Sequence, residues 1–314
     1  MIKRTLYFGN PAYLSMRNAQ LVIQIPDIQS NVTLTTDFKK MNERTIPIED
    51  IGMVVLDNKR ITITTGVIEA LLANNSAVIT CDSKSMPTGM MLPLECNTLQ
   101  NERFSDQIHA SLPLRKQLWQ QTIKMKITNQ EKILSLYGNT NTNCMKVWAR
   151  EVKSDDADNL EARAAAYYWK YLFPNIPGFV RGRDEAPPNN LLNFGYAILR
   201  AVIARSLVGS GLLPTLGIHH HNRYNAYCLA DDIMEPYRPF VDEHVIYVMK
   251  SVDSFDVLTR DIKAKLLEIP TIDIHIEGKR FPLMVGAGIT TASLAKCFSG
   301  ELRQIKYPEK VYHD

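Results

Sequence analysis

Residues 97–106 read NTLQNERFSD, a polar stretch without an apolar period, and the pattern of hydrophobicity differs on its two sides. Before this stretch apolar residues alternate with polar ones, which is typical of β-strands; after it they recur at helical spacing. A polar connection between two such patterns is typical of an interdomain linker. The sequence therefore predicts an α+β protein, with a β-sandwich-like domain over residues 1–100 and an all-helical domain over residues 101–314.

The first part of the chain predicts short strands with one helix among them. Apolar residues alternate with polar ones in two stretches, the first of which ends at Pro26. Two further strands flank the polar residues 57–59, which are suited to a hairpin turn. The expected elements are strands over 21–25, 32–34, 53–56, 60–64 and 77–81 and a helix over 67–75.

The second part predicts helices, because its apolar residues follow the helical period. A loop rich in proline and charge separates two of them at residues 174–190. The helical signal fades after about residue 280, and the tail after about residue 300 is expected to be disordered. The expected helices cover 107–129, 130–137, 158–173, 189–208 and 225–250, the last interrupted by Pro236 and Pro239.

The composition is that of an ordinary folded protein, with 45% hydrophobic and 22% charged residues in 314. This excludes collagen-like, low-complexity and largely disordered classes. The 36 basic and 33 acidic residues give a net charge of +3, but the charge is unevenly placed. Residues 101–153 carry nine basic and four acidic residues, an excess of five, whereas residues 1–100 carry nine of each. A local excess of this kind is compatible with a polyanionic partner.

The five cysteines are widely spaced and include no C-x-x-C pair. This argues against a disulfide framework and a cysteine zinc site, and is typical of a reducing cytoplasm. The N-terminus lacks the apolar run of a secretory signal. No stretch approaches the roughly 18 apolar residues of a membrane helix. We therefore expect a cytoplasmic protein without a membrane partner.

The first candidate segment for chemistry is the helix that starts near residue 158. Asp156 or Asp158 is placed to cap it, which leaves Glu161 in the first turn beside a run of alanines. A carboxylate next to small residues can approach a second element closely. The alternative is that Glu161 only interacts favourably with the helix dipole, as acidic residues in first turns do.

The second candidate segment combines three consecutive histidines, residues 219–221, with the acidic stretch 230–236. Imidazole and carboxylate groups are ligands for Mn²⁺, and carboxylates also suit Mg²⁺. Asp232 and Glu235 are three residues apart and would share one helix face, while Pro236 disfavours the α conformation at Glu235. The alternative is a solvated helix start beside an incidental histidine run. The His-x-x-x-His spacing of zinc hydrolases is absent.

Several blocks of the sequence, in order and at the right spacing, resemble the CRISPR adaptation endonuclease-integrase family (Cas-one), and among its members the short ones of type II systems. The resemblance covers roughly residues 1–300. The family has an N-terminal β domain and a C-terminal helical domain. The blocks are Leu6-Tyr7-Phe8, residues 46–51 with Asp57-Asn58, and residues 77–82, 190–196, 216–220 and 232–239.

This resemblance implies a set of metal ligands for Mg²⁺ or Mn²⁺. Glu161 matches the glutamate of the family's Glu-Gly-x-Ala-Ala-x-x-Tyr helix, although Ala162 replaces the usual glycine. His220 matches the histidine that follows Leu-Gly-Ile-x. Glu235 matches the acid three residues after the motif aspartate, here Asp232, which is expected to be a supporting carboxylate. The resemblance therefore implies Glu161, His220 and Glu235 as catalytic metal ligands.

The resemblance also implies a reaction and partners. The family joins the 3′-hydroxyl ends of a prespacer duplex to the CRISPR repeat by transesterification. Residues 101–314 are then the catalytic domain and residues 1–100 the dimerisation domain. The expected partners are double-stranded DNA, a second copy of the chain and a small Cas-two protein, in a heterohexamer-like complex. The basic residues expected to handle DNA are Lys124, Lys126, Lys132, Lys146, Arg150, Lys153, Arg181, Arg183 and Arg238.

Two alternative functions remain open at this point. The first is a metal-dependent nuclease that acts on branched DNA in repair with the same ligands. The second is a structural DNA-binding subunit whose site is degenerate. The products formed from a repeat-containing plasmid would separate the first from an integrase. Substitution of the three ligands would identify the second.

Overall fold

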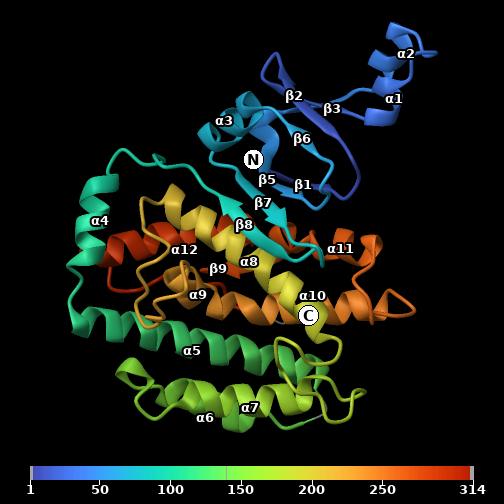
Figure 1. Ribbon diagram of the computed structural model, residues 1–314. Coiled ribbons are helices and arrows are strands. Elements are labelled where there is room, and N and C mark those ends of the chain that lie inside the picture. The colour runs from blue at the N-terminus through green and yellow to red at the C-terminus, as the bar shows by residue number, and fades with distance from the viewer. Residues whose placement is uncertain (1–2, 139, 312–314) are drawn as a thin grey trace. The chain divides into compact units, whose positions relative to one another are not determined.

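The computed structural model describes residues 3–138 and 140–311 and divides into two compact units, Met1–Cys96 and Asn97–Asp314. Figure 1 shows strands concentrated in the first unit and helices in the second. The predicted α+β class with a helical C-terminal part is confirmed. Each unit has its own core, so each is considered separately.

In the described part of the first unit the strands form two four-stranded sheets. One sheet has the order β1-β5-β7-β8, with parallel pairs between β1, β5 and β7. The other has the order β4-β3-β2-β6. The strands are β1 Arg4–Phe8, β2 Tyr13–Arg17, β3 Gln20–Gln24, β4 Arg44–Pro47, β5 Ile51–Leu56, β6 Thr62–Ile63, β7 Ala77–Cys81 and β8 Pro87–Met91.

Side chains from both sheets and from helix α3 (Thr65–Ala73) share one core. Leu14 and Leu21 come from the second sheet, Val54 and Val78 from the first, and Leu71 from α3. All are almost fully buried. β5 is apolar along its whole length, as expected for a central parallel strand that is covered on both faces. The sandwich-like interpretation therefore describes this unit correctly.

Two details of the predicted strands are wrong. Residues 32–34 lie in a turn between helices α1 (Pro26–Ser30) and α2 (Thr36–Met41), and Val32 is 93% exposed. Pro26 ends the preceding strand by opening α1, a position where its missing N–H costs nothing. The polar residues 57–59 do not close a hairpin either. β6 does not pair with β5; it pairs in parallel with β2 of the other sheet.

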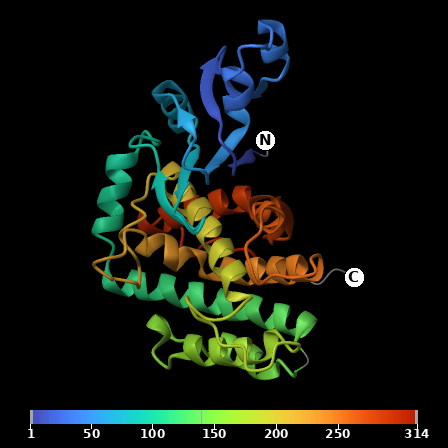
Figure 2. The same cartoon turned by 45° about the vertical axis from the view of Figure 1, so that its right-hand side comes forward.

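The second unit is built from helices with one short hairpin. In Figures 1 and 2, α8 runs through its middle, with α10 and α12 packed against it, while α6 and α7 lie along α5. The helices are α4 Gln100–Ile108, α5 Leu112–Tyr137, α6 Asn143–Glu151, α7 Leu160–Leu172, α8 Asn189–Gly209, α9 Cys228–Met234, α10 Arg238–Lys250, α11 Arg260–Leu266 and α12 Leu283–Phe298, and the hairpin is β9 Asp273–Ile276 with β10 Lys279–Pro282. Short 3₁₀ helices cover η1 Ile48–Asp50 in the first unit and η2 Ser154–Asp156, η3 Glu235–Tyr237 and η4 Ile269–Thr271 in the second.

Helix α8 corrects the expectation that no segment has the length and apolarity of a membrane span. Among the described residues it alone passes that test, but 78% of its most apolar window is buried inside the unit. A largely apolar and buried helix is also what the centre of a large helical domain requires. Its contacts with α10 and α12 are consistent with this role.

Four further predictions for the second unit need correction. The polar stretch that begins at residue 97 contains helix α4, and residues 112–137 form one continuous helix, capped by Ser111, instead of two. Helix α12 was not predicted, because glycines and threonines weaken its apolar period. The segment 300–311 is ordered by tertiary contacts, since Tyr307 is buried and Glu309 pairs with His275. The expected disorder of residues 312–314 lies outside the described residues.

Candidate metal centre

Glu161 lies at the start of α7, where Asp156 caps the helix. Both carboxylate oxygens of Asp156 accept backbone N–H groups at 2.9 Å, one from Leu160 and one from Glu161. The chain before the helix adopts left-handed conformations at Asp156 and Asn159, which bring the capping carboxylate under the first turn. The expected cap at Asp156 is thus present, and it holds the backbone of Glu161 directly.

Glu235 lies where α9 passes into α10 through η3. Pro236 lies at the beginning of η3 and has no N–H to donate, which suits a first helical turn. Glu235 itself adopts the α conformation, so the expectation that Pro236 would disfavour it there is wrong. The Glu235 side chain is only 5% exposed, and its Oε1 lies 2.9 Å from Nη2 of Arg238. Burial raises the pKa of the Glu235 carboxyl, but Arg238 and Lys126 outweigh burial, so its pKa lies below the ordinary value. Glu235 is therefore a buried carboxylate kept ionised by two cations.

Lys126 of α5 connects the two glutamates. Its Nζ lies 2.6 Å from Oε1 of Glu161 and 2.6 Å from Oε2 of Glu235. The first contact is a hydrogen bond; the second lacks hydrogen-bond geometry, and Oε2 of Glu235 has no hydrogen-bond partner among the described residues. Burial lowers the pKa of Lys126, but the two carboxylates outweigh it and hold the pKa above the ordinary value. A positive charge thus sits between two carboxylates that come from distant parts of the sequence.

His220 is held by Asp232, which is fully buried. One oxygen of Asp232 accepts the backbone N–H groups of Ile218 (2.7 Å) and His219 (3.0 Å). The other oxygen accepts the backbone N–H of His220 (3.2 Å) and lies 2.5 Å from its Nδ1. The hydrogen bond to Asp232 raises the pKa of His220, although burial opposes it. With Nδ1 turned to a carboxylate, Nε2 is the nitrogen that remains for a metal, which is the usual arrangement of a metal-binding histidine.

Gly217 and Trp119 explain why the loop has this shape. A side chain at Gly217 would collide with the carbonyl oxygen of His220 and with Asp232, so the loop closes this tightly only with glycine. The indole of Trp119 stacks on His219, with ring centroids 4.1 Å apart and planes 3° apart, and meets the His220 ring edge-on at 5.6 Å. His219 therefore packs against Trp119, whereas Nδ1 of His220 faces Asp232.

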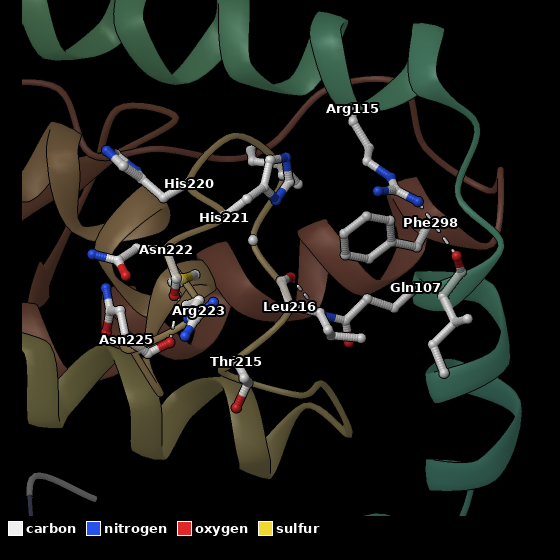
Figure 3. Close-up of a pocket in the computed structure, with 14 residues that line it drawn as sticks. Gln107, Arg115, Thr215, Leu216, His220, His221, Asn222, Arg223, Asn225 and Phe298 are labelled. Atoms are coloured by element: carbon white, nitrogen blue, oxygen red, sulfur yellow. Dashed lines mark hydrogen bonds between the residues drawn. The ribbon is translucent and has the colours of Figure 1, made fainter.

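A cavity of about 400 Å³ adjoins His220 (Figure 3). Arg115 of α5 reaches its wall from one side, and the loop carrying His221, Asn222 and Arg223 forms the other. Its labelled lining thus includes amide and guanidinium donors as well as imidazole rings. Such donors recognise phosphate and sugar oxygens.

The donor set fits a divalent ion, with one qualification. Two carboxylates and a histidine with a fixed Nδ1 are ligands suited to Mn²⁺ or Mg²⁺. Nevertheless, the described residues contain no group of three or more His, Cys, Asp or Glu side chains already gathered as a metal site. The Lys126 ammonium lies between Glu161 and Glu235. Glu161, His220 and Glu235 are the candidate residues for holding such an ion.

Two residues at this site were not predicted to act there. Lys126 and Arg238 were both expected to contact DNA, but both form ion pairs with Glu235. A signal for Lys126 was available, since it follows Trp119 and Ile123 on the apolar face of α5, at a core position of the helical period. A lysine at such a position requires a buried partner.

Comparison with known proteins identifies the family. The family model described as CRISPR associated protein Cas1 matches residues 7–256. A CRISPR-associated endonuclease Cas1 from Neisseria meningitidis serogroup C (strain 8013) is 33% identical over 311 residues, which cover 98% of this chain and 97% of that protein.

Solved structures share the fold. A casposase bound to integration product superposes with a TM-score of 0.75 at 20% identity, covering 97% of this chain and 92% of that one. A chain of a Cas6-RT-Cas1–Cas2 complex gives a TM-score of 0.71 at 18% identity, covering 99% of this chain and 36% of that one. The extent of the sequence matches leaves one conclusion: the chain belongs to the Cas1 family of CRISPR-associated proteins.

Proposed function

We propose that this protein is a metal-dependent DNA endonuclease and integrase of CRISPR adaptation, which joins the 3′-hydroxyl ends of a short duplex to the CRISPR repeat. The observation that supports this most is the convergence of Glu161 and Glu235 on one cation position, each 2.6 Å from Nζ of Lys126. The Neisseria relative is named an endonuclease, and the casposase was solved with an integration product.

The proposed ligands are Glu161, His220 and Glu235. A divalent ion bound there would supply electrostatic stabilisation of the anionic phosphoryl group and would orient the attacking and leaving oxygens. The protein's own contribution is preorganisation. Asp232 fixes the His220 ring, and Asp156 fixes the helix start of Glu161. Strand transfer needs no nucleophile from the protein, because the DNA 3′-hydroxyl attacks.

The DNA contacts are proposed for two surfaces of the second unit. The cavity beside His220 offers Arg115 and Arg223 to a DNA backbone that leads to the metal centre. A smaller cavity of about 290 Å³ between α5 and α6 is lined by Lys124 and Arg150, both exposed. Contacts of this kind bind phosphate without sequence preference and weaken with salt.

The proposed partners are a second copy of the chain and a small Cas2-type protein. The Cas6-RT-Cas1–Cas2 complex supports the second partner. We assign dimerisation to the first unit, where large apolar side chains including Val32, Phe38 and Met41 are exposed around α1 and α2. Light scattering of the purified chain should give a dimer mass, and a monomer mass would contradict this assignment.

The function is tested with a repeat-containing plasmid, a short duplex with free 3′ ends, the Cas2-type protein and Mn²⁺ or Mg²⁺. We expect joined DNA with the wild type and none with Glu235→Gln, while binding of the duplex in a gel-shift assay survives. Glu301→Gln, at an exposed glutamate, is the matched control. Cleavage without joining would favour a nuclease that acts on branched DNA, and unchanged joining by Glu235→Gln would exclude the metal-ligand assignment.

A further inference from the structure

Lys126 occupies the place between the two glutamates that a metal ion would take. We propose that Lys126 is an internal counter-cation, which holds Glu161 and Glu235 in place while the protein is metal-free and leaves when a divalent ion binds. This inference rests on the proposed metal dependence. It adds a second state of the site, in which the protein itself supplies the positive charge.

The distances place the ammonium where an ion bridging the same two oxygens from the side of Lys126 would lie. Nζ lies 2.6 Å from Oε1 of Glu161 and from Oε2 of Glu235. A divalent ion lies about 2.0–2.6 Å from a carboxylate oxygen. An ion that takes this position would overlap with the ammonium group. The other oxygen of Glu235, Oε1, faces Arg238 at 2.9 Å. Each oxygen of Glu235 thus already has a cation beside it, and an ion that enters between the two glutamates competes with Lys126.

Of the two cations, Lys126 is the one whose charged group can be displaced by rotation of its own side chain alone. The guanidinium of Arg238 is fixed by packing, since its Cζ lies 4.8 Å from the ring centre of Tyr196. Its planar group lies over that ring, so turning it away would break this contact. The ammonium of Lys126 is a point charge at the end of a flexible four-carbon stem, and its side chain is 10% exposed. Rotation about the stem bonds can therefore move the ammonium without moving α5.

The charges explain why a cation is needed in the metal-free protein. Glu235 is 5% exposed and Glu161 is 27% exposed, and both lie within contact distance of one ammonium nitrogen. Without Lys126, two carboxylates would face each other with little water between them, which is unfavourable. With Lys126, the ion must displace an existing partner before it binds. Lys126 therefore stabilises the metal-free fold and weakens metal binding at the same time.

The first test compares Mn²⁺ binding by calorimetry in the wild type, Lys126→Met and Lys170→Met. Lys170 lies exposed near the C-terminal end of α7, the helix that carries Glu161, and serves as the matched control. We expect Lys126→Met to bind Mn²⁺ at least tenfold more tightly than the wild type, because charge-assisted contacts no longer compete. Its melting temperature should be lower in a chelator and should rise more on addition of Mn²⁺. Lys170→Met should match the wild type in both measurements.

The second test uses the wild type and does not depend on how the variant folds. Lysines are labelled with an amine-reactive reagent, with and without Mg²⁺, and the labelled positions are quantified by mass spectrometry. We expect labelling of Lys126 to increase severalfold with Mg²⁺, while labelling of Lys170 stays constant. If the wild type binds the ion but Lys126 stays protected and Lys126→Met binds no more tightly, the counter-cation is refuted and the proposed function survives. If the wild type binds neither ion, both fall.

Discussion

Asp232→Asn tests how the histidine loop is held, because it removes a charge and preserves the shape of the side chain. In the wild type the carboxylate of Asp232 accepts three backbone N–H groups, and its Oδ1 also lies within hydrogen-bond distance of Nδ1 of His220. An amide has one oxygen to accept with and an NH₂ group that only donates. We expect the variant to lose both stability and the correct histidine tautomer.

The magnitude follows from the two orientations open to the amide. If the NH₂ group replaces Oδ2, the N–H groups of Ile218 and His219 lose a buried acceptor. If it replaces Oδ1, the NH₂ group faces Nδ1 of His220, which must then accept, and the ring proton moves to Nε2, the proposed ligand atom. Losing a hydrogen bond to a buried charged group costs about 1.5–3 kcal/mol. We therefore expect the free energy of unfolding to fall by about 3 kcal/mol.

The loss of stability in Asp232→Asn should depend on pH, because His220 titrates. The hydrogen bond to Asp232 raises the folded-state pKa of His220, against burial. A raised histidine pKa contributes stability that is fully present below the unfolded pKa of about 6.5 and is lost as the pH rises through the folded pKa. The variant lacks this contribution, so its deficit should be largest below about pH 6.5 and smaller above the folded pKa.

Urea unfolding at several pH values gives the stability, and nuclear magnetic resonance of the imidazole nitrogens gives the tautomer and the pKa. Asp253→Asn, at an exposed aspartate, controls for the loss of one surface charge. A variant with wild-type stability and with Nδ1 of His220 still protonated would refute the role assigned to Asp232. Equal deficits at all pH values would refute only the histidine contribution.

Three further substitutions test other parts of the second unit. Asp242 is buried and its pKa is raised by burial to about 6, so its contribution to stability is lost as the pH rises through that value. Between about pH 4 and 7 the free energy of unfolding, measured with urea, should fall by about 3 kcal/mol more in the wild type than in Asp242→Asn. The same pH dependence in both proteins would contradict this. Asp156→Ala should lower the free energy of unfolding by about 1–2 kcal/mol and weaken Mn²⁺ binding by shifting Glu161. Unchanged Mn²⁺ binding would show that the cap does not position Glu161 for the ion. Gly217→Ala should distort the His220 loop and cost about 1–3 kcal/mol, whereas a wild-type melting temperature would show that the loop accommodates a methyl group.

The sequence predicts elements best where the apolar period is strong. The strand at 77–81 and the helix at 189–208 agree with β7 and α8 to within one residue. The period fails where partners decide the conformation. Val32 alternates correctly with its neighbours but has no sheet to join, and α12 is built from small residues that pack without a strong apolar stripe.

The candidate site likewise combines features set by local sequence with features set by tertiary packing. The first turn containing Glu161 and the cap at Asp156 follow from local rules, because capping is a short-range interaction. The meeting of Glu161 with Glu235 does not, since 74 residues separate them and tertiary packing of α7, α5 and η3 brings them together. Motif resemblance supplied the candidate ligands but not the place of Lys126 between two of them. A resemblance transfers residue identities, whereas the charge between two carboxylates becomes evident only in three dimensions.

Residues 101–153, the basic segment, offer less unpaired positive charge to DNA than their excess of five charges implies. Lys126 forms ion pairs with the two glutamates of the candidate centre. Lys132 pairs with Glu309 and Lys153 with Asp158. The first pair links α5 to the C-terminal segment and the second is local to the start of α7; both have exposed carboxylates and add little to stability. A cation already paired with a carboxylate adds less to the attraction of phosphate than an unpaired one. The excess of five positive charges is only a count of residues. The electrostatic potential at the surface depends on which of these residues have no carboxylate beside them.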